Sequence, residues 1–292
     1  MTGQSLGFLG VGVMGEPMCR NMAIKSGLEM SAFDLDKEAL ERLSAHRVKA
    51  RTSVEDVVRN SDFVFFSLPS GEVLSRMVHG EKGILALARP GQIFVDLSTT
   101  QVKLTKEIAA AFTARGAVYF DAPVARTRQA AEAGTLAITV GGPEAQFGTI
   151  KPFLDFLAND VVYCGEVGSG QILKLLNNMI VFETVGALAE AIAVGEAAGM
   201  SGQFLFETLS KSSADSFVLR NHGMKSMVPQ VFPERAFSVT YALKDLSYAL
   251  ELSKEMHIEL PGALLVKKRF EEAIEKGWGD QYHPVISRLL RK

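Results

Sequence analysis

The chain has 292 residues, of which 47% are hydrophobic and 22% charged, a composition typical of a folded globular protein and not of a disordered or fibrous one. Its length is roughly twice the usual domain size of about 150 residues, which predicts two domains or one large α/β domain. Because 31 Lys and Arg residues nearly balance 33 Asp and Glu residues, the net charge of -2 argues against nucleic acid or an anionic membrane as the partner and favours a small molecule.

The two cysteines, Cys19 and Cys164, are far apart in the sequence and share no CxxC spacing. This argues against a disulfide framework or a zinc site and fits a reducing compartment. The N-terminal residues lead directly into an apolar strand-like run, without the basic and apolar stretches of a signal peptide. We therefore expect a cytoplasmic protein.

From residue 5 to about 164, short β-rich runs alternate with segments of helical period, which is typical of βαβ units and a parallel sheet. The expected strands cover residues 6–9, 29–33, 63–68, 93–97, 118–120, 136–140 and 161–163. Amphipathic helices are expected between them, among others at 53–60, 102–114 and 144–157. The pattern predicts a Rossmann-like, doubly wound, mostly parallel sheet domain over residues 1–164.

The pattern changes at a glycine cluster, 165–170, beyond which nearly every segment has helical period. This predicts an all-helical domain over residues 165–292, opened by a long helix that ends near Ala198. Its segment 179–200 approaches the length of a membrane span but contains Glu183, Glu190 and Glu196, each costly at the centre of a bilayer. We interpret it as a buried helix of a soluble protein. Part of it is expected at the interface of a homodimer or homotetramer, because one small domain can hardly cover so apolar a helix.

A glycine motif directly follows the first expected strand. Gly10, Gly12 and Gly15, with Val13 and Met14 between them, form a G-x-G-x-x-G sequence before a helical segment. Such glycines allow a tight turn and a close approach of the backbone to a pyrophosphate, which the helix N-terminus then binds. Taken alone, the motif is as compatible with an ordinary glycine-rich turn.

The second expected strand supplies the context, because it ends at Asp34, nineteen positions after Gly15. An acid at this distance reaches the ribose hydroxyls of the adenosine half of a dinucleotide; the alternative is a helix N-cap. Since Leu35 and Asp36 follow, a 2′-phosphate would meet two carboxylates. The sequence therefore favours NAD over NADP.

The long helix carries a group of polar residues near its start. Lys174, Asn177 and Asn178 are spaced i, i+3 and i+4, which places them on one face of an otherwise apolar helix. A single lysine there is more often a surface residue with a buried stem. Two neighbouring amides suit a site for a polar substrate, and the positive helix N-terminus favours loss of the lysine proton, as a general acid/base requires.

These motifs together resemble the β-hydroxyacid dehydrogenase family, which contains 3-hydroxyisobutyrate dehydrogenases and tartronate semialdehyde reductases. The resemblance covers nearly the whole chain. The matching segments are 7–18 (GFLGVGVMGEPM), 67–69 (SLP), 96–99 (DLST), 121–124 (DAPV), 134–136 (GTL), 170–178 (GQILKLLNN) and 243–246 (LKDL).

The resemblance implies that Lys174 is the catalytic acid/base and that Asn178 binds the substrate, with Asn177 and Ser98 beside it. It also implies cofactor contacts from Leu68, Pro69, Thr99 and Lys244, in addition to the glycine loop and Asp34. Each of these has an ordinary structural alternative: residues 68–69 as a strand exit, 98–99 as a helix cap, and 244–245 as a solvated helix pair.

The chain departs from the family after residue 124, where most members have Ser-Gly-Gly and this chain has Ala125-Arg126-Thr127. An arginine fork recognises carboxylate, sulfonate or phosphate, so Arg126 with Thr127 predicts a substrate with a strongly anionic head. An Arg-Thr pair here is similar to the sulfolactaldehyde reductases of the family. The alternative is that Arg126 and Arg128 are solvated loop residues.

The five histidines form no metal-ligand pattern, so no metal is expected. The sequence thus predicts an NAD-dependent oxidoreductase that interconverts a short anionic hydroxyacid and its aldehyde or ketone. The hydride would pass to or from the nicotinamide. A protein that binds NAD without turnover, as a sensor on the same fold, remains the alternative.

Overall fold

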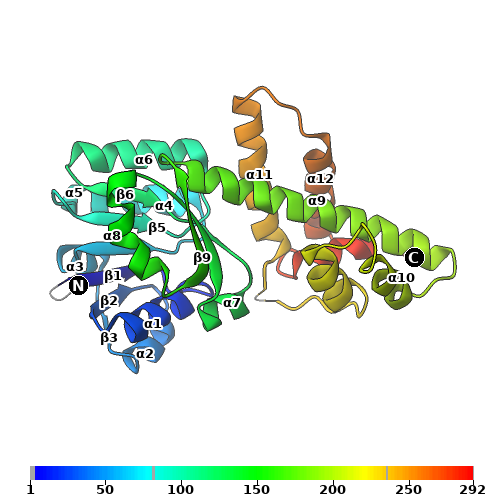
Figure 1. Cartoon of the computed structure of the whole chain (residues 1–292), viewed down its shortest axis with the longest axis horizontal. Coiled ribbons are helices and arrows are strands. Elements are labelled where there is room, and N and C mark those ends of the chain that lie inside the picture. The colour runs from blue at the N-terminus through cyan, green and yellow to red at the C-terminus, as the bar shows by residue number, and fades with distance from the viewer. Residues whose placement is uncertain (1–3, 81–82, 235, 292) are drawn as a thin grey trace. The chain divides into compact units, whose positions relative to one another are not determined.

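The computed structural model describes residues 4–80, 83–234 and 236–291. The chain divides into two compact units, Met1–Lys174 and Leu175–Lys292. The first contains a sheet with helices and the second contains helices, as Figure 1 shows, which confirms the predicted fold class. The division falls within one continuous helix, α9 (Ser169–Ala197), and the domain limits at 164 and 165 stay a prediction.

Within the described residues, nine strands form one sheet in the order β3-β2-β1-β4-β5-β6-β8-β7, with β9 paired to β8. The strands are β1 (Ser5–Leu9), β2 (Glu29–Phe33), β3 (Val48–Ala50), β4 (Phe63–Phe66), β5 (Ile93–Asp96), β6 (Val118–Asp121), β7 (Val124–Ala125), β8 (Leu136–Gly141) and β9 (Ala158–Gly165). The pairs from β3 to β6 are parallel, whereas β8 runs antiparallel to β6 and β7. The strand order reverses between β1 and β4, the point at which doubly wound sheets bind their ligands.

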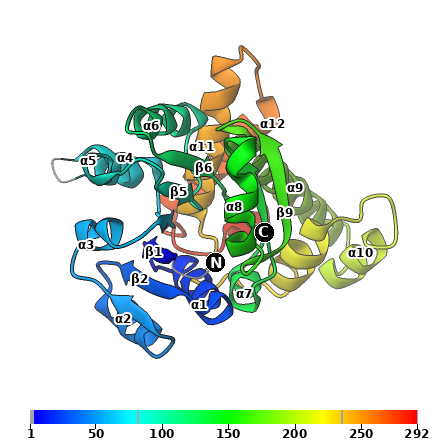
Figure 2. The same ribbon diagram turned by 60° about the vertical axis from the view of Figure 1, so that its left-hand side comes forward.

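Both faces of this sheet are covered by helices, as Figure 2 shows. The helices are α1 (Gly15–Ser26), α2 (Lys37–Ser44), α3 (Val54–Arg59), α4 (Gly71–His79), α5 (Ile84–Leu87), α6 (Val102–Ala114), α7 (Arg128–Ala133) and α8 (Glu144–Leu154). In β4, Phe63 and Phe65 pack with α1, α2 and α8, while Val64 and Phe66 pack with α3, α4 and α6. Burial on both faces explains why this strand is apolar at every position.

The second unit is built from α9 beyond Lys174 and from α10 (Gly202–Leu209), the π-helix η1 (Leu219–Met227), α11 (Val239–Glu255), α12 (Pro261–Glu275) and the 3₁₀-helix η2 (His283–Leu289). Phe182, Val185 and Ile192 of α9 lie in its core. Among the described residues after α9, only two isolated β-bridges occur and no strand. The predicted all-helical character is therefore confirmed.

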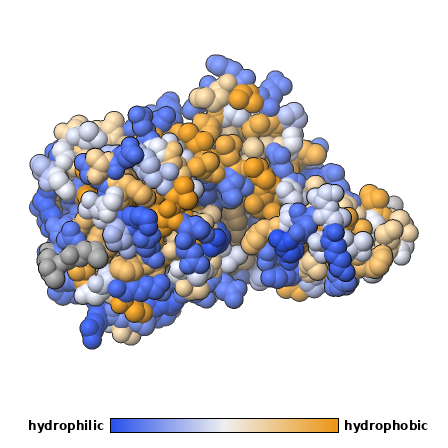
Figure 3. All heavy atoms as spheres, in the orientation of Figure 1, coloured by the Kyte–Doolittle hydropathy of each residue, from blue (hydrophilic) through white to orange (hydrophobic). Residues whose placement is uncertain are grey.

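Helix α9 is long and apolar enough to cross a membrane by length and composition, a test that core helices of soluble proteins also pass. Only 39% of its most apolar window is buried within the chain. Ile180 and Val194 are 60% and 70% exposed, and Figure 3 shows apolar side chains gathered along the helical unit. The expectation of a buried helix therefore holds for one face of α9 and leaves the other uncovered in the monomer.

Candidate cofactor and catalytic site

The glycine loop lies between β1 and α1, as predicted. Gly10 has φ +90°, and a Cβ there would lie 2.3 Å from the carbonyl oxygen of Ser67. A Cβ at Gly15 would lie 2.0 Å from the carbonyl oxygen of Gly10, so this glycine lets α1 begin against the loop. A Cβ at Gly12 would meet nothing within 4 Å. Open space above Gly12, together with an α1 N-terminus that no side chain caps, fits a pyrophosphate.

Asp34 lies at the end of β2, beside this loop. Its Oδ2 accepts a hydrogen bond from the backbone N–H of Val11 at 2.6 Å, and its Oδ1 accepts one from Asp36 N–H at 2.8 Å. The N-cap of α2 is Asp36, which accepts from the N–H groups of Glu38 and Ala39, so the alternative role of Asp34 as a cap is wrong. Its carboxylate is held at the glycine loop, where this fold binds the adenosine ribose.

The exits of β4 and β5 meet because the two strands are paired in parallel. Leu68 and Pro69 follow β4, and Ser98 and Thr99 follow β5. The Leu68 N–H donates to Ser98 Oγ at 2.9 Å, and Ser98 is only 4% exposed. The structure thus brings these four predicted contact residues to neighbouring strand ends.

A buried carboxyl that the sequence reasoning missed supports this region. Asp96, fully buried, accepts hydrogen bonds from the Ser98 N–H at 2.9 Å and the Tyr119 hydroxyl at 3.0 Å. Burial raises the pKa of Asp96 to about 6, although the hydrogen bonds from Ser98 and Tyr119 favour the ionised form. A polar residue at the end of a strand that is otherwise apolar was the available signal.

Arg126 stands in an unusual backbone conformation. Its φ is +86°, in the left-handed region that favours glycine. Its guanidinium donates to the Thr135 carbonyl oxygen and to Asp160 Oδ2, both at 2.6 Å. Thr127 is the N-cap of α7, where its hydroxyl oxygen accepts from Ala130 N–H at 3.4 Å. Strand β9 therefore already supplies one carboxylate partner to Arg126.

The second and third turns of α9 carry Lys174, Asn177 and Asn178, as the spacing predicts. Asn177 Nδ2 donates to Asn178 Oδ1 at 3.1 Å, and Asn178 Nδ2 donates to Asp245 Oδ2 at 2.7 Å. Asn178 is 4% exposed and Asp245 is 3% exposed. Asp245, on α11, was not among the predicted site residues, although it lies within the matching segment 243–246.

Lys244 directly precedes Asp245 on α11, and the Lys244 side chain is 20% exposed. Its Nζ lies 3.0 Å from Asp245 Oδ1 and over the rings of Tyr241 and Tyr248, at 5.6 and 5.2 Å from their centroids. A cation held in this way is oriented by its neighbours, since both the carboxylate and the aromatic faces attract it. The solvated helix pair expected as the alternative does not describe this mostly buried ion pair.

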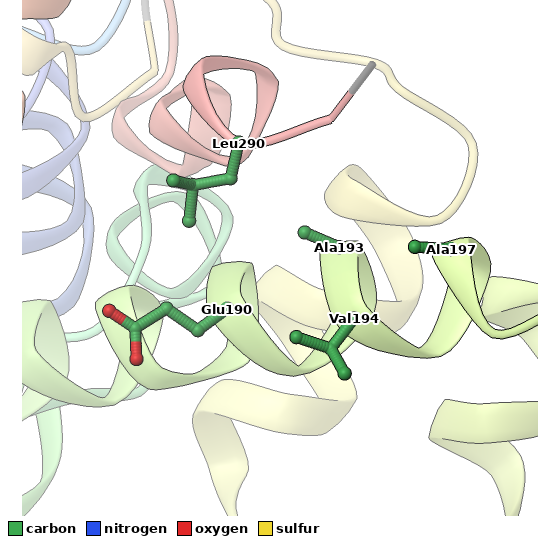
Figure 4. Close-up of a pocket in the computed structure, with 5 residues that line it drawn as sticks. All are labelled: Glu190, Ala193, Val194, Ala197 and Leu290. Atoms are coloured by element: carbon green, nitrogen blue, oxygen red, sulfur yellow. The ribbon is translucent and has the colours of Figure 1, made fainter.

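A cavity of about 290 Å³ lies further along α9, lined by Glu190, Ala193, Val194, Ala197 and Leu290. Figure 4 shows Leu290 opposite the α9 residues. At 1.5 Å per residue, Glu190 is about 24 Å along the helix from Lys174, so this cavity is separate from the predicted catalytic residues. Across residues 4–80, 83–234 and 236–291, no three His, Cys, Asp or Glu side chains gather as a metal site would require.

Comparisons with known proteins agree with these motifs. Residues 5–165 match the model of the NAD-binding domain of 6-phosphogluconate dehydrogenase, and residues 168–290 match the NAD-binding model of NADP-dependent 3-hydroxyisobutyrate dehydrogenase. The chain is 32% identical to 2-(hydroxymethyl)glutarate dehydrogenase of Eubacterium barkeri, over 94% of this chain and 90% of that protein. The chain belongs to the β-hydroxyacid dehydrogenase family.

Other members of the family show the same extent of similarity. The 2-hydroxy-3-oxopropionate reductase of Escherichia coli is 30% identical, over 98% of this chain and 96% of its own length. The structure of Mycobacterium tuberculosis 3-hydroxyisobutyrate dehydrogenase with L-serine superposes with a TM-score of 0.90 at 29% identity, covering 99% of both chains.

As a member of the β-hydroxyacid dehydrogenase family, the protein is an NAD-dependent oxidoreductase that acts on hydroxyacids. The related proteins named above are dehydrogenases and reductases, which decides against the non-catalytic alternative. The described residues fit the cofactor, because the glycine loop leaves room for a pyrophosphate and Asp34 is fixed beside it.

Proposed function

We propose that this enzyme reduces a short aldehyde with a strongly anionic head to the corresponding hydroxyacid-type alcohol, or catalyses the reverse oxidation, with Lys174 as general acid/base. The main observation in support of this proposal is the arrangement of Lys174, Asn177 and Asn178 on α9. Lys174 is followed one turn later by two amides, one of which is locked by a hydrogen bond to the buried Asp245. An ordered row of this kind suits the orientation of a polar substrate.

In this mechanism Lys174 gives its proton to the carbonyl oxygen during reduction and takes the hydroxyl proton during oxidation. NAD, when bound at the glycine loop and Asp34, would supply or accept the hydride. Asn177 and Asn178 orient the substrate oxygens. The bond from Asn178 to Asp245 fixes which end of the amide is the donor, because the carboxylate can only accept.

Arg126 and Thr127 bind the anionic head in this proposal. The support is the backbone strain at Arg126, because a positive φ costs a residue with a side chain roughly 1–2 kcal/mol. Strain of this size is typical of functional positions. Three of the five guanidinium N–H donors remain after the bonds to Thr135 and Asp160, enough for a two-pronged contact. A sulfonated substrate, as in sulfolactaldehyde reductases, is the class this fork suits best.

NAD is the preferred cofactor in this proposal, because the Asp34 carboxylate repels a 2′-phosphate. The remaining cofactor contacts are those expected of Leu68, Pro69, Thr99 and Lys244, while Ser98 is expected at the substrate. The protein is further proposed to act in the cytoplasm as a homodimer or homotetramer. The uncovered apolar face of α9 supports the assembly, since exposed apolar area of this extent is typical of interfaces.

The proposal is tested by following NADH consumption with four aldehydes. Sulfolactaldehyde, tartronate semialdehyde and succinic semialdehyde carry an anionic head, and glyceraldehyde is the neutral control. We expect kcat/KM for the best anionic aldehyde to exceed that for glyceraldehyde by about a hundredfold or more, the size of a charge-assisted contact of about 3 kcal/mol. Equal efficiency with charged and neutral aldehydes would contradict an anion-binding role for Arg126.

A further inference from the structure

A buried set of hydrogen bonds ties the first turn of α9 to the end of β6. Asp121, the last residue of β6, is fully buried, and its two carboxylate oxygens accept from the N–H groups of Gly168 and Gln171 at 2.7 and 2.8 Å. Capping of a helix N-terminus by a carboxylate is favourable, but such a cap usually comes from the preceding residues. Here it comes from a strand of the sheet, 47 and 50 positions earlier in the sequence.

The side chain of Gln171 extends the same network to the exit of β5. Gln171 is fully buried. Its Nε2 donates to the Ser98 carbonyl oxygen at 2.8 Å, and its Oε1 accepts from the Thr100 N–H at 3.1 Å. Both polar atoms of one side chain are thus used to hold the segment 98–100, which contains the expected cofactor contact Thr99.

Close packing fixes the helix start as well. A Cβ at Gly170 would lie 2.5 Å from the Thr139 carbonyl oxygen and 2.9 Å from two oxygens of Asp121, so only glycine fits. The Thr139 hydroxyl donates to the Gly170 carbonyl oxygen at 3.1 Å. The backbone of α9 therefore rests directly on β6 and β8, one turn before Lys174.

We infer that Gln171 and Asp121 are positioning residues of the reaction, which set the place of Lys174 relative to the cofactor-binding strand exits. This inference rests on the proposed acid/base role of Lys174. Lys174 is at i+3 from Gln171, so any shift of the first turn of α9 moves it directly. Displacement of a catalytic group by about 1 Å can lower a rate by about a hundredfold.

The chain offers a matched control in Gln92, at the opposite end of β5. Gln92 is 4% exposed, and its Nε2 donates to the carbonyl oxygens of Val58 and Ser61, both at 2.8 Å. Its Oε1 accepts from the Arg89 N–H at 3.1 Å. Gln92→Met therefore removes three side-chain hydrogen bonds far from Lys174, and Gln171→Met removes two beside it, both from the same unit.

The experiment compares kcat for the best aldehyde of the panel, the dissociation constant of NADH and the melting temperature in both variants and in Lys174→Ala. We expect both methionine variants to lose similar stability. We expect Gln171→Met alone to lose kcat, by about tenfold or more, with the NADH dissociation constant changed less than about threefold. A purely structural role of Gln171 predicts equal kcat losses in the two methionine variants, and this result would overturn the inference.

The Lys174→Ala variant distinguishes failure of the positioning role of Gln171 and Asp121 from failure of the acid/base role of Lys174. Loss of turnover in Lys174→Ala with parental kcat in Gln171→Met overturns the positioning role alone, whereas parental turnover in both overturns the acid/base role as well. Should Gln171→Met fail to fold, Asp121→Asn is the second variant, because it keeps the shape of the side chain and one acceptor oxygen. We expect a fall in kcat of at least about threefold, and an unchanged kcat in folded Asp121→Asn would count against the inference.

Discussion

Replacement of Arg126 by glycine should separate stability from specificity. The backbone at this position has φ +86°, which glycine adopts freely, so Arg126→Gly relieves roughly 1–2 kcal/mol of strain. The variant also loses the hydrogen bond to the Thr135 carbonyl oxygen, about 1 kcal/mol, and the ion pair with Asp160. Because the Arg126 and Asp160 side chains are 40% and 56% exposed, their ion pair contributes about 0–1 kcal/mol. The greater freedom of glycine in the unfolded chain costs a further fraction of a kcal/mol, so these terms nearly cancel and we expect a net change within about 1 kcal/mol of zero.

The same substitution should remove the contact between the Arg126 guanidinium and the anionic head of the substrate. Loss of a desolvated, charge-assisted contact of about 2–4 kcal/mol corresponds to a fall in kcat/KM of roughly 30-fold to 1000-fold for the best anionic aldehyde. Glyceraldehyde should be reduced with nearly parental efficiency. Arg126→Lys serves as the second variant, because a point ammonium keeps the charge but cannot form the planar fork.

Two measurements decide this prediction. Calorimetry should show a melting temperature for Arg126→Gly within about 3 °C of that of the parent. The NADH-consumption assay should show that kcat/KM falls for the anionic aldehydes and stays near the parental value for glyceraldehyde. A melting temperature several degrees lower, together with unchanged kcat/KM for every aldehyde, would mean that Arg126 is a structural loop residue and that the strain has no link to the substrate.

Three further predictions concern other parts of the chain. Asp34→Asn should narrow the preference for NAD over NADP by about tenfold or more, mainly through the KM for NAD, and an unchanged ratio of kcat/KM values would exclude Asp34 from cofactor selection. Burial lowers the pKa of His222 from 6.5 to about 4 and that of His283 well below its usual value, so the unfolded chain binds these protons more readily; the contribution of these two histidines to stability should therefore fall as the pH drops from about 6.5 to 4. His283→Phe should flatten this fall in the melting temperature, and an identical pH profile would refute the assignment. Val194→Glu should shift the sedimentation coefficient towards the monomer while the exposed control Val162→Glu does not, and a parental coefficient for Val194→Glu would remove this face of α9 from any subunit contact.

The fold was largely predictable because the sheet and the helices carry strong local patterns. The seven expected strands are all present, and the clearest signal is that of β4, because a parallel strand buried on both faces is continuously apolar. Two strands were missed: β3 has three residues and β7 has two, too short for any periodicity to register. The helix expected at 144–157 ends at Leu154, shortly after Pro152 in its last turn.

Parts of the candidate site could be predicted from the sequence where all residues of a motif lie in one short segment. The glycine loop and the spacing of Lys174, Asn177 and Asn178 are local, so sequence alone identifies them. The positioning roles proposed for Asp121 and Gln171 depend on hydrogen bonds between β6, the exit of β5 and the start of α9, and no spacing in the sequence encodes such contacts. The positive φ of Arg126 was equally hidden, because arginine gives no local signal for it.

The measurement that tests the central claim most directly is the turnover of Lys174→Ala at saturating NADH with the best aldehyde, compared with the exposed-lysine control Lys151→Ala. The account predicts that Lys174→Ala loses turnover by about a hundredfold or more, the usual size of a general acid/base contribution, while its NADH dissociation constant stays near the parental value. Lys151→Ala, which removes a solvent-exposed pair with Asp155, should keep parental turnover. Turnover of Lys174→Ala within a few-fold of the parent would contradict the acid/base role of Lys174.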